Sequence, residues 1–197
     1  MAAWQTGRDG QQPQRQRLAP QGKRSQHQDG ADTAADRRNF GAGQQGIADA
    51  DKICIVGAGY GGYAAMMDAI HAPDLYQCAV SYAGVSDLEY LVKMARNYTN
   101  YESVKQQIGD DFSLLEQNSP LTHVDKINVP VLLLHGTDDR SVPYQQSDMM
   151  YKALLRQNKP VEYIEFDKGD HYLSNNSHRL ETFKAMDRFL KQHLKAN

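Results

Sequence analysis

From residue 47 onward, short apolar runs alternate with stretches that repeat their apolar residues at helical spacing. The runs are typical of buried strands, and they cover residues 53–56, 78–82, 131–135 and 161–166. Residues 60–70 and 144–157 predict helices between them, and the second helix places Met150 and Leu154 on one face. Because strands separated by helices form βαβ units, the pattern predicts an α/β fold with a parallel sheet of about four strands flanked by helices.

The C-terminal segment predicts one more helix, and we expect the hydroxyl of Ser177 to cap its first turn. The apolar stripe of this helix, the side that normally packs on a core, consists of Leu180, Phe183, Met186, Leu190 and Leu194. Cys54 and Cys78 both lie in predicted strands. Two cysteines are too few for a disulfide scaffold or a four-cysteine zinc site, so we interpret both as small core residues.

Residues 1–46 differ in composition from the rest of the chain. They contain neither Ile nor Val, and their large apolar residues are Met1, Trp4, Leu18 and Phe40. So little apolar surface does not offset the entropy of ordering a chain, and we expect this segment to be disordered. It holds seven Lys/Arg and four Asp/Glu, and the whole chain has a net charge of −2. A net charge this small does not indicate binding to nucleic acid or to an anionic membrane. The chain also has no run of about 18 apolar residues, the length that spans a bilayer.

A glycine-rich turn joins the first predicted strand to the first predicted helix. Gly57, Gly59 and Gly62 match G-x-G-x-x-G, a fingerprint of dinucleotide binding. That fingerprint needs an acid at the end of the next strand, which instead ends in residues 81–84 without one. The turn also has the spacing of a nucleophile elbow, G-x-S-x-G, with Gly59 in the position of the serine. A tight connection without any chemistry is the third interpretation.

Two later strands each lead into a loop with polar residues. The strand at 131–135 is followed by Asp138 and Asp139, and the strand at 161–166 by His171. A serine hydrolase of this fold has its nucleophile, acid and histidine in that chain order. The acid fixes the tautomer of the imidazole, and the imidazole takes the proton of the nucleophile. The order therefore favours the elbow interpretation of the turn, with either aspartate as the acid.

Residues 57–63, 135–143 and 169–171 together resemble the catalytic domain of the prolyl oligopeptidase family, in its dipeptidyl-peptidase and acylaminoacyl-peptidase branch. The resemblance runs from about Gln45 to the C-terminus and implies the C-terminal half of an α/β-hydrolase domain, residues 47–197, with residues 1–46 outside it. It implies that Asp139 is the triad acid, with Asp138 as the adjacent alternative, and that His171 is the base. The implied oxyanion donor is the backbone N–H of Tyr60, and the implied substrate is a short peptide or acyl compound, with no cofactor and no metal.

The resemblance also implies a pocket for the residue that precedes the scissile bond. Its residues would be Val85, Leu88, Leu91 and Val142, for which an ordinary core role is an equal alternative.

Gly59 stands where the family has its serine, so we expect an inactive or nearly inactive member. The alternatives are a non-catalytic relative that binds a peptide or a partner chain, and a dinucleotide-binding module. The strand at 53–56 is expected to lie at an open apolar edge of the sheet. Such an edge pairs readily with another chain, so we expect self-association.

Overall fold

The computed structural model describes residues 45–46, 49, 51–96 and 101–194. The chain divides into two units, residues 1–30 and 31–197, and all described residues lie in the second. The disorder expected for residues 1–46 therefore falls almost wholly outside the described residues. Within them, no helix is long and apolar enough to cross a membrane.

Four parallel strands form the sheet, in the order β1-β2-β3-β4. They are β1 (Cys54–Ala58), β2 (Cys78–Tyr82), β3 (Val131–Gly136) and β4 (Val161–Phe166). The predicted α/β class and four-stranded parallel sheet are confirmed. β2 and β3 are buried at every position, because each lies between two strands and beneath helices on both faces.

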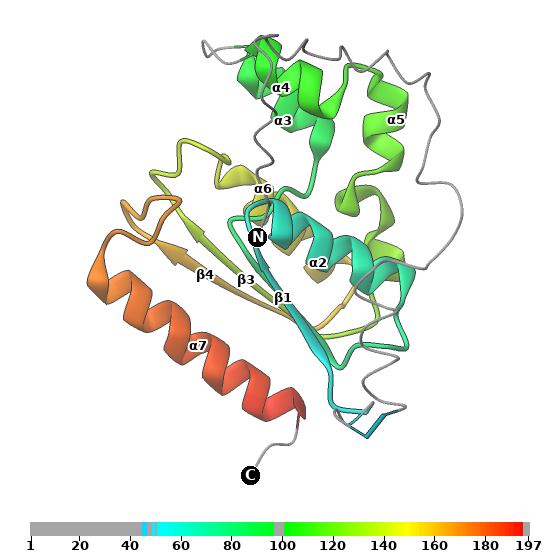
Figure 1. Ribbon diagram of the computed structural model, residues 1–197, viewed down its shortest axis with the longest axis vertical. Helices are drawn as coiled ribbons and strands as arrows, with labels where there is room; N and C mark the ends of the chain where they lie inside the picture. Colours follow the sequence, from blue (N-terminus) through cyan, green and yellow to red (C-terminus); the bar gives the residue numbers. More distant parts are fainter. Residues whose placement is uncertain (1–44, 47–48, 50, 97–100, 195–197) are drawn as a thin grey trace, which may run out of the picture. The chain divides into compact units, whose positions relative to one another are not determined.

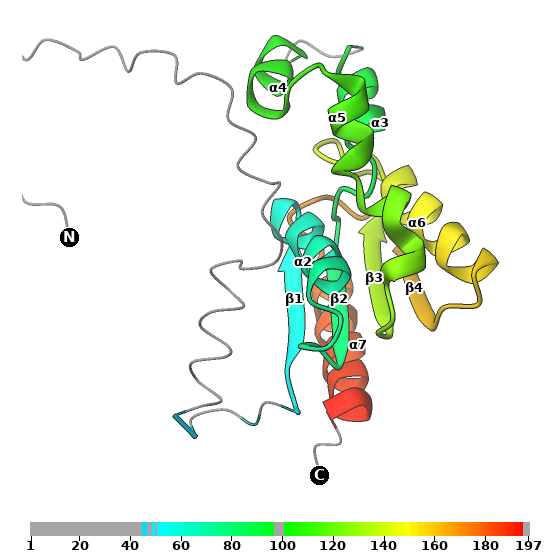
Figure 2. The same ribbon diagram turned by 90° about the vertical axis from the view of Figure 1, so that its right-hand side faces the viewer.

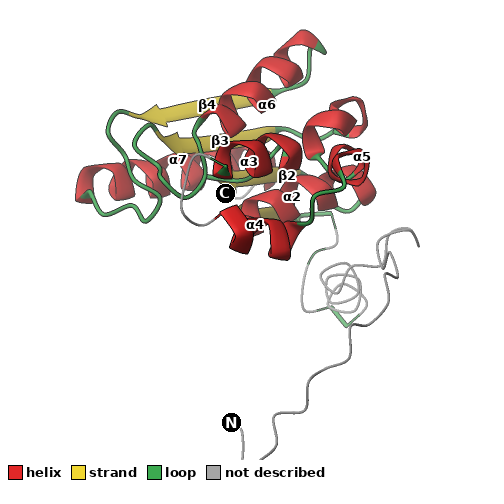
Figure 3. Ribbon diagram, turned by 90° about the horizontal axis from the view of Figure 1, so that it is seen from above, coloured by secondary structure: helices red, strands yellow, loops and turns green. Residues whose placement is uncertain are grey.

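Helices flank the strands on both faces (Figure 1; Figure 3). One face is covered by α2 (Tyr60–His71), the 3-10 helix η1 (Pro120–Lys126) and α6 (Gln145–Arg156). Met150 and Leu154 of α6 are fully buried there, as the periodicity predicts. The other face is covered by α7 (Asn176–Leu194). Three short helices, α3 (Leu88–Ala95), α4 (Tyr101–Ile108) and α5 (Phe112–Gln117), lie beyond the carboxyl ends of the strands (Figure 2).

The two cysteines are not separate thiols. Cys54 and Cys78 are directly opposite in the β1–β2 register, with Cα atoms 4.7 Å apart, and they form a disulfide. The expectation of small core residues was right for Cys78, which is fully buried, whereas Cys54 is only half-buried against the same core. The expectation was wrong in leaving the pair unbonded. Only strand pairing, which brings two residues 24 positions apart side by side, reveals the bond.

Helix α7 differs from its prediction in two ways. Ser177 lies inside the helix, and the side-chain oxygen of Asn175 accepts hydrogen bonds from the Ser177 N–H and hydroxyl. The side of the helix that packs on the sheet is formed by Thr182, Ala185 and Phe189. Leu180 and Phe183 of the predicted stripe are instead 56% and 60% exposed. The apolar stripe is present, but α7 is rotated so that only one side of the stripe packs on the sheet.

Candidate active site

The loops that follow β3 and β4 are joined to each other. The Thr137 N–H donates to the Phe166 carbonyl at 3.0 Å, and the Asp138 N–H donates to the Gly169 carbonyl at 2.9 Å. The loops approach so closely at Gly136 that a Cβ atom there would lie 2.2 Å from the Gly169 carbonyl oxygen. Residue 136 must therefore lack a side chain, and this contact fixes the β3 loop against the β4 loop.

Asp139 lies in the β3 loop with a buried carboxylate. Its Oδ1 accepts hydrogen bonds from the Ser141 and Val142 N–H groups, each at 2.8 Å. Its Oδ2 lies 2.7 Å from Nδ1 of His171 and 3.3 Å from Nε2 of His135. Burial alone would raise the pKa of the carboxyl, but the hydrogen bonds from both histidines and both N–H groups hold the pKa well below its usual range. The acid is thus ionised and held at both oxygens.

His171 completes an acid–base pair with Asp139. The hydrogen bond to Asp139 raises the pKa of His171, although partial burial of the ring acts in the opposite direction. The Tyr82 hydroxyl, whose pKa burial raises to about 12, donates to the Asp170 carbonyl at 2.8 Å and so anchors the loop beside His171. Asp138 is exposed and lies 3.9 Å from Arg140. Of the two adjacent aspartates, Asp139 is the one brought to the imidazole.

Gly59 lies at the tip of the turn between β1 and α2, facing the imidazole. Its backbone has φ 57° and ψ −120°, a conformation that is strained for residues with a side chain. A Cβ atom built there would lie 3.3 Å from Nε2 of His171, the ring nitrogen opposite the one bonded to Asp139. The three predicted positions therefore come together in the order residue 59, imidazole, carboxylate, from three loops that are far apart in the sequence.

Tyr60 is the first residue of α2, so its backbone N–H has no partner within the helix. It is also placed at the positive end of the helix dipole. Both features suit an N–H that receives a developing negative charge beside residue 59.

A cavity of about 510 Å³ adjoins the loop that carries Asp139. It is lined by Leu91, Met94, Ala95, Val104, Thr137, Asp139, Arg140, Ser141, Pro143, Tyr144 and Gln145. Of the four expected pocket residues, Leu91 is in this wall. Val85 and Val142 are buried, Leu88 is half-buried, and none of these three lines the cavity. A pocket role for those three stays a prediction.

Two contributors to the site are absent from the sequence prediction, His135 and Tyr82. His135 is fully buried, with Nδ1 2.8 Å from the Ser147 hydroxyl and Nε2 3.0 Å from the Val142 carbonyl. A histidine that ends an otherwise apolar strand is a detectable signal of a buried polar contact. Nothing in the sequence connects Tyr82 with residue 170.

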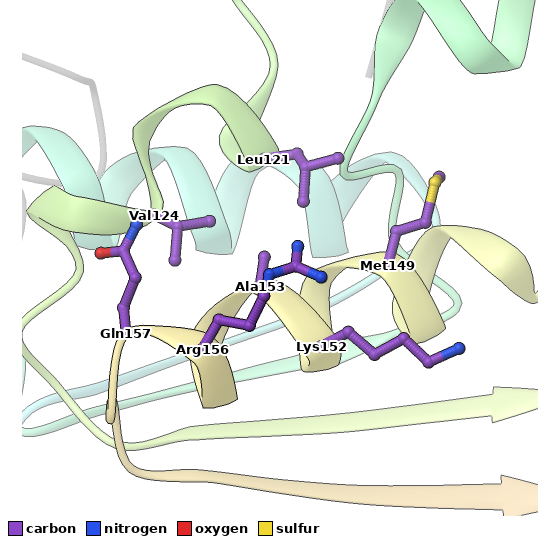
Figure 4. A pocket seen from close by; sticks show the side chains of 7 residues that line it. All are labelled: Leu121, Val124, Met149, Lys152, Ala153, Arg156 and Gln157. Carbon is purple, nitrogen blue, oxygen red and sulfur yellow. The ribbon is translucent and has the colours of Figure 1, made fainter.

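A second cavity, of about 470 Å³, lies between η1 and α6 (Figure 4). Its wall includes Leu121, Val124, Lys152 and Arg156, and no residue of the three loops described above. It is therefore separate from the candidate site. No cluster of three or more His, Cys, Asp or Glu side chains able to hold a metal is found among the described residues.

Comparisons with known proteins agree on one family. The model of the prolyl oligopeptidase family matches residues 24–197, beginning upstream of the expected boundary at residue 47. Dipeptidyl aminopeptidase BIII of Pseudoxanthomonas mexicana is 33% identical over 135 residues, which are 65% of this chain and 20% of that protein. Dipeptidyl peptidase family member 6 of Caenorhabditis elegans is 27% identical over 75% of this chain and 21% of its own length.

Solved structures give the same result. A puromycin-hydrolyzing peptidase of Mycobacterium tuberculosis superposes with a TM-score of 0.74 at 29% identity, over 81% of this chain and 24% of that one. Acylaminoacyl peptidase of Pyrococcus horikoshii gives a TM-score of 0.74 at 26% identity, over 83% and 27%. The chain thus spans about a fifth to a quarter of the length of these relatives. It has the α/β-hydrolase fold and belongs to the prolyl oligopeptidase family of serine peptidases.

Proposed function

We propose that this chain carries the acid and base of a serine-peptidase site but does not itself perform acyl transfer, because its nucleophile position is glycine. One observation carries the proposal. Residue 59 lies at the tip of the turn facing Nε2 of His171, whose other ring nitrogen is bonded to Asp139, and residue 59 has no side chain.

Acyl transfer requires the side chain that residue 59 lacks. In acyl transfer, a serine Oγ attacks the substrate carbonyl while its proton passes to the imidazole, and the leaving group then takes that proton. The intermediate is an ester of the serine, which glycine cannot form. Removing the nucleophile of such a triad lowers turnover by about 10⁶, and oxyanion stabilisation and binding leave roughly 10³–10⁴ over water.

Restoring the side chain tests the proposal. We expect Gly59→Ser to become covalently labelled by a fluorophosphonate probe, which reacts with activated serines, whereas the parent chain is not labelled. The substitution places a side chain at a positive φ, so we expect it to lower the free energy of unfolding by about 1–3 kcal/mol. Circular dichroism confirms that the variant is folded before labelling is scored.

Two matched variants complete the test. Gly59→Ala adds the Cβ atom without an oxygen and should stay unlabelled. Gly59→Ser combined with His171→Ala keeps the hydroxyl but removes the base, and its labelling should fall to background. Labelling of the unsubstituted chain would contradict the proposal, and so would a folded Gly59→Ser variant that is no more reactive than Gly59→Ala.

A second function, binding of a peptide without cleavage, is favoured by the cavity of about 510 Å³ beside Asp139. Three of its lining residues, Leu91, Met94 and Val104, are apolar and suit an apolar side chain. An acylaminoacyl peptidase with this fold was solved with Z-Gly-Gly-Phe-chloromethyl ketone, so dye-labelled Z-Gly-Gly-Phe is a reasonable probe. Leu91→Arg should weaken its binding, while Leu114→Arg, at an exposed leucine outside the cavity, should not.

No comparable observation favours the alternative that the chain is a dinucleotide-binding module. The imidazole of His171 lies against Gly59 and occupies the space in front of the turn, where a pyrophosphate would bind.

A further inference from the structure

We propose that His135 is a positioning residue for the acid of the candidate site, because its Nε2–H holds the oxygen of Asp139 that also bonds to His171. Ser147 of α6 anchors the same ring at its other nitrogen. The inference rests on the proposed function, since it concerns the same acid–base pair, and it adds to that pair a second imidazole that comes from β3 itself.

The strand and the helix bring these two polar side chains together. Residues at alternate positions of a strand share a face, so His135 follows Val131 and Leu133 toward the core beneath α6. Ser147 lies one helical turn before Met150 on α6, and both are buried. The strand therefore directs an imidazole, and the helix a hydroxyl, into the same apolar interior.

The hydrogen bonds of His135 fix its tautomer. Nε2 lies 3.0 Å from the Val142 carbonyl oxygen, which can only accept, so Nε2 carries a proton. Nδ1 lies 2.8 Å from the Ser147 hydroxyl, which donates to the remaining lone pair of the ring. His135 is 0% exposed and Ser147 is 2% exposed, so the ring has these partners inside the described fold.

The Nε2–H of His135 also faces the acid. Oδ2 of Asp139 lies 3.3 Å from Nε2 of His135 and 2.7 Å from Nδ1 of His171. The Nε2 proton is therefore shared between a carbonyl and the carboxylate, and the negative charge at Oδ2 is shared between two rings. Val142 also donates its N–H to Oδ1 of Asp139, so His135 closes a ring of contacts around the loop that carries the acid.

Sharing the charge affects His171 in a way that a merely space-filling histidine would not. A carboxylate beside an imidazole favours the charged ring, and a second N–H on the same oxygen weakens that effect. The hydrogen bond to Asp139 raises the pKa of His171, and the contact with His135 is among those that lower the pKa of Asp139. His135 thus limits how strongly the acid binds the proton of its partner ring.

NMR titration of His171, in the chain that retains Gly59, tests this role without requiring a nucleophile. His135→Phe keeps a flat ring but removes the shared N–H, and we expect the pKa of His171 to rise by about 0.5–1 unit. His135→Gln provides an amide N–H of similar reach, and we expect it to bring the pKa of His171 back close to that of the parent chain. Asp170 and Tyr172, which also adjoin His171, are unchanged in both variants.

Ser147→Ala tests the anchor and disturbs the core less. Without the hydroxyl the ring of His135 is held less firmly, so the pKa of His171 should rise, by less than in His135→Phe. The matched control is Ser81→Ala, because Ser81 is 1% exposed and its hydroxyl has no hydrogen-bond partner among the described residues. The control should leave the pKa of His171 unchanged, and Ser147→Ala keeps the test valid if His135→Phe does not fold.

The Gly59→Ser background gives a second readout. An imidazole acts as a base only when it is unprotonated, so fluorophosphonate labelling should increase as the pH rises through the pKa of His171. We expect His135→Phe to move the midpoint of this increase to a higher pH and Ser81→Ala to leave the midpoint in place.

The outcomes separate this inference from the proposed function. A folded Gly59→Ser variant that is not labelled contradicts the proposed function, while the titration of His171 still decides the role of His135. A folded His135→Phe variant in which the pKa of His171 is unchanged or lower overturns the positioning role. An equal rise in His135→Gln or in Ser81→Ala overturns it as well, because the shift would then not depend on the shared N–H.

Discussion

The two halves of the sheet differ in what they contribute to the candidate active site. The β3–β4 half contributes the ionised Asp139 and the imidazole of His171, bonded to each other, and its edge strand carries Glu162 paired with Arg188. The β1 half contributes a turn whose tip is glycine and a strand, Cys54–Ala58, without a charge. The glycine at the nucleophile position thus lies in the turn that follows β1, away from the loops that hold the acid and the base.

This contrast shows that a loss of chemistry at Gly59 does not require a loss of the surrounding site. The hydrogen bonds that hold Asp139 come from its own loop, from His135 of β3 and from the β4 loop. None of them involves residue 59, so the acid–base pair stays assembled without a nucleophile. The experiments below test how far each half depends on its own contacts.

The largest effect is expected from removing the charge that the β3–β4 half supplies. In a Gly59→Ser background, Asp139→Asn should lower the rate of fluorophosphonate labelling by about 10⁴, because the amide no longer holds the imidazole in the reactive tautomer. Asp138→Asn is the matched control at the adjacent, exposed aspartate, and it should change the rate little. A larger loss from Asp138→Asn would show that the assignment of the acid is wrong.

The next effect concerns the bond that holds β1 to the rest of the sheet. The disulfide closes a loop between cysteines 24 positions apart, and in the chain-entropy account a loop of this size stabilises a fold by about 3 kcal/mol. Replacing both cysteines with alanine should lower the free energy of unfolding by about that amount. Urea denaturation at one fixed protein concentration measures it.

Reduction of the unsubstituted chain provides the control for this prediction. The reduced chain and the double-alanine variant should unfold at similar urea concentrations. If the reductant leaves the unfolding curve of the parent chain unchanged, the contribution of the disulfide is contradicted.

The smallest expected effect concerns the pKa values of His171 and Asp139. The hydrogen bond to Asp139 raises the pKa of His171. The contribution of His171 to stability is therefore complete below its ordinary pKa of 6.5, and it is lost as the pH rises through the pKa of the folded state. Asp139 has a lowered pKa, so its contribution is present above 3.8 and is lost as pH falls toward the folded value. The pair therefore stabilises the fold most between these two ordinary values.

NMR titration of the His171 ring measures this directly. We expect Asp139→Asn to lower the pKa of His171, since the negative charge is removed and only partial burial remains. An unchanged pKa in the variant would mean that the bond to Asp139 does not control this imidazole.

Several features of the fold could be predicted because they depend on contacts near in sequence. The runs 78–82 and 161–166 match β2 and β4 residue for residue. The chain order of residue 59, the two aspartates and His171 was sufficient to predict a shared site, since the carboxyl ends of parallel strands meet at one edge. The family resemblance added the choice of Asp139 over Asp138.

Other features were decided only by tertiary structure, because they depend on which surfaces face each other. The disulfide required β1 and β2 to align Cys54 with Cys78. The exposure of Leu180 and Phe183 required a rotation of α7 that its own periodicity does not specify. The amino-acid sequence thus determined the elements, their order and the missing side chain at residue 59. The packing of distant segments determined which of the apolar residues are covered and which carboxylate meets the imidazole.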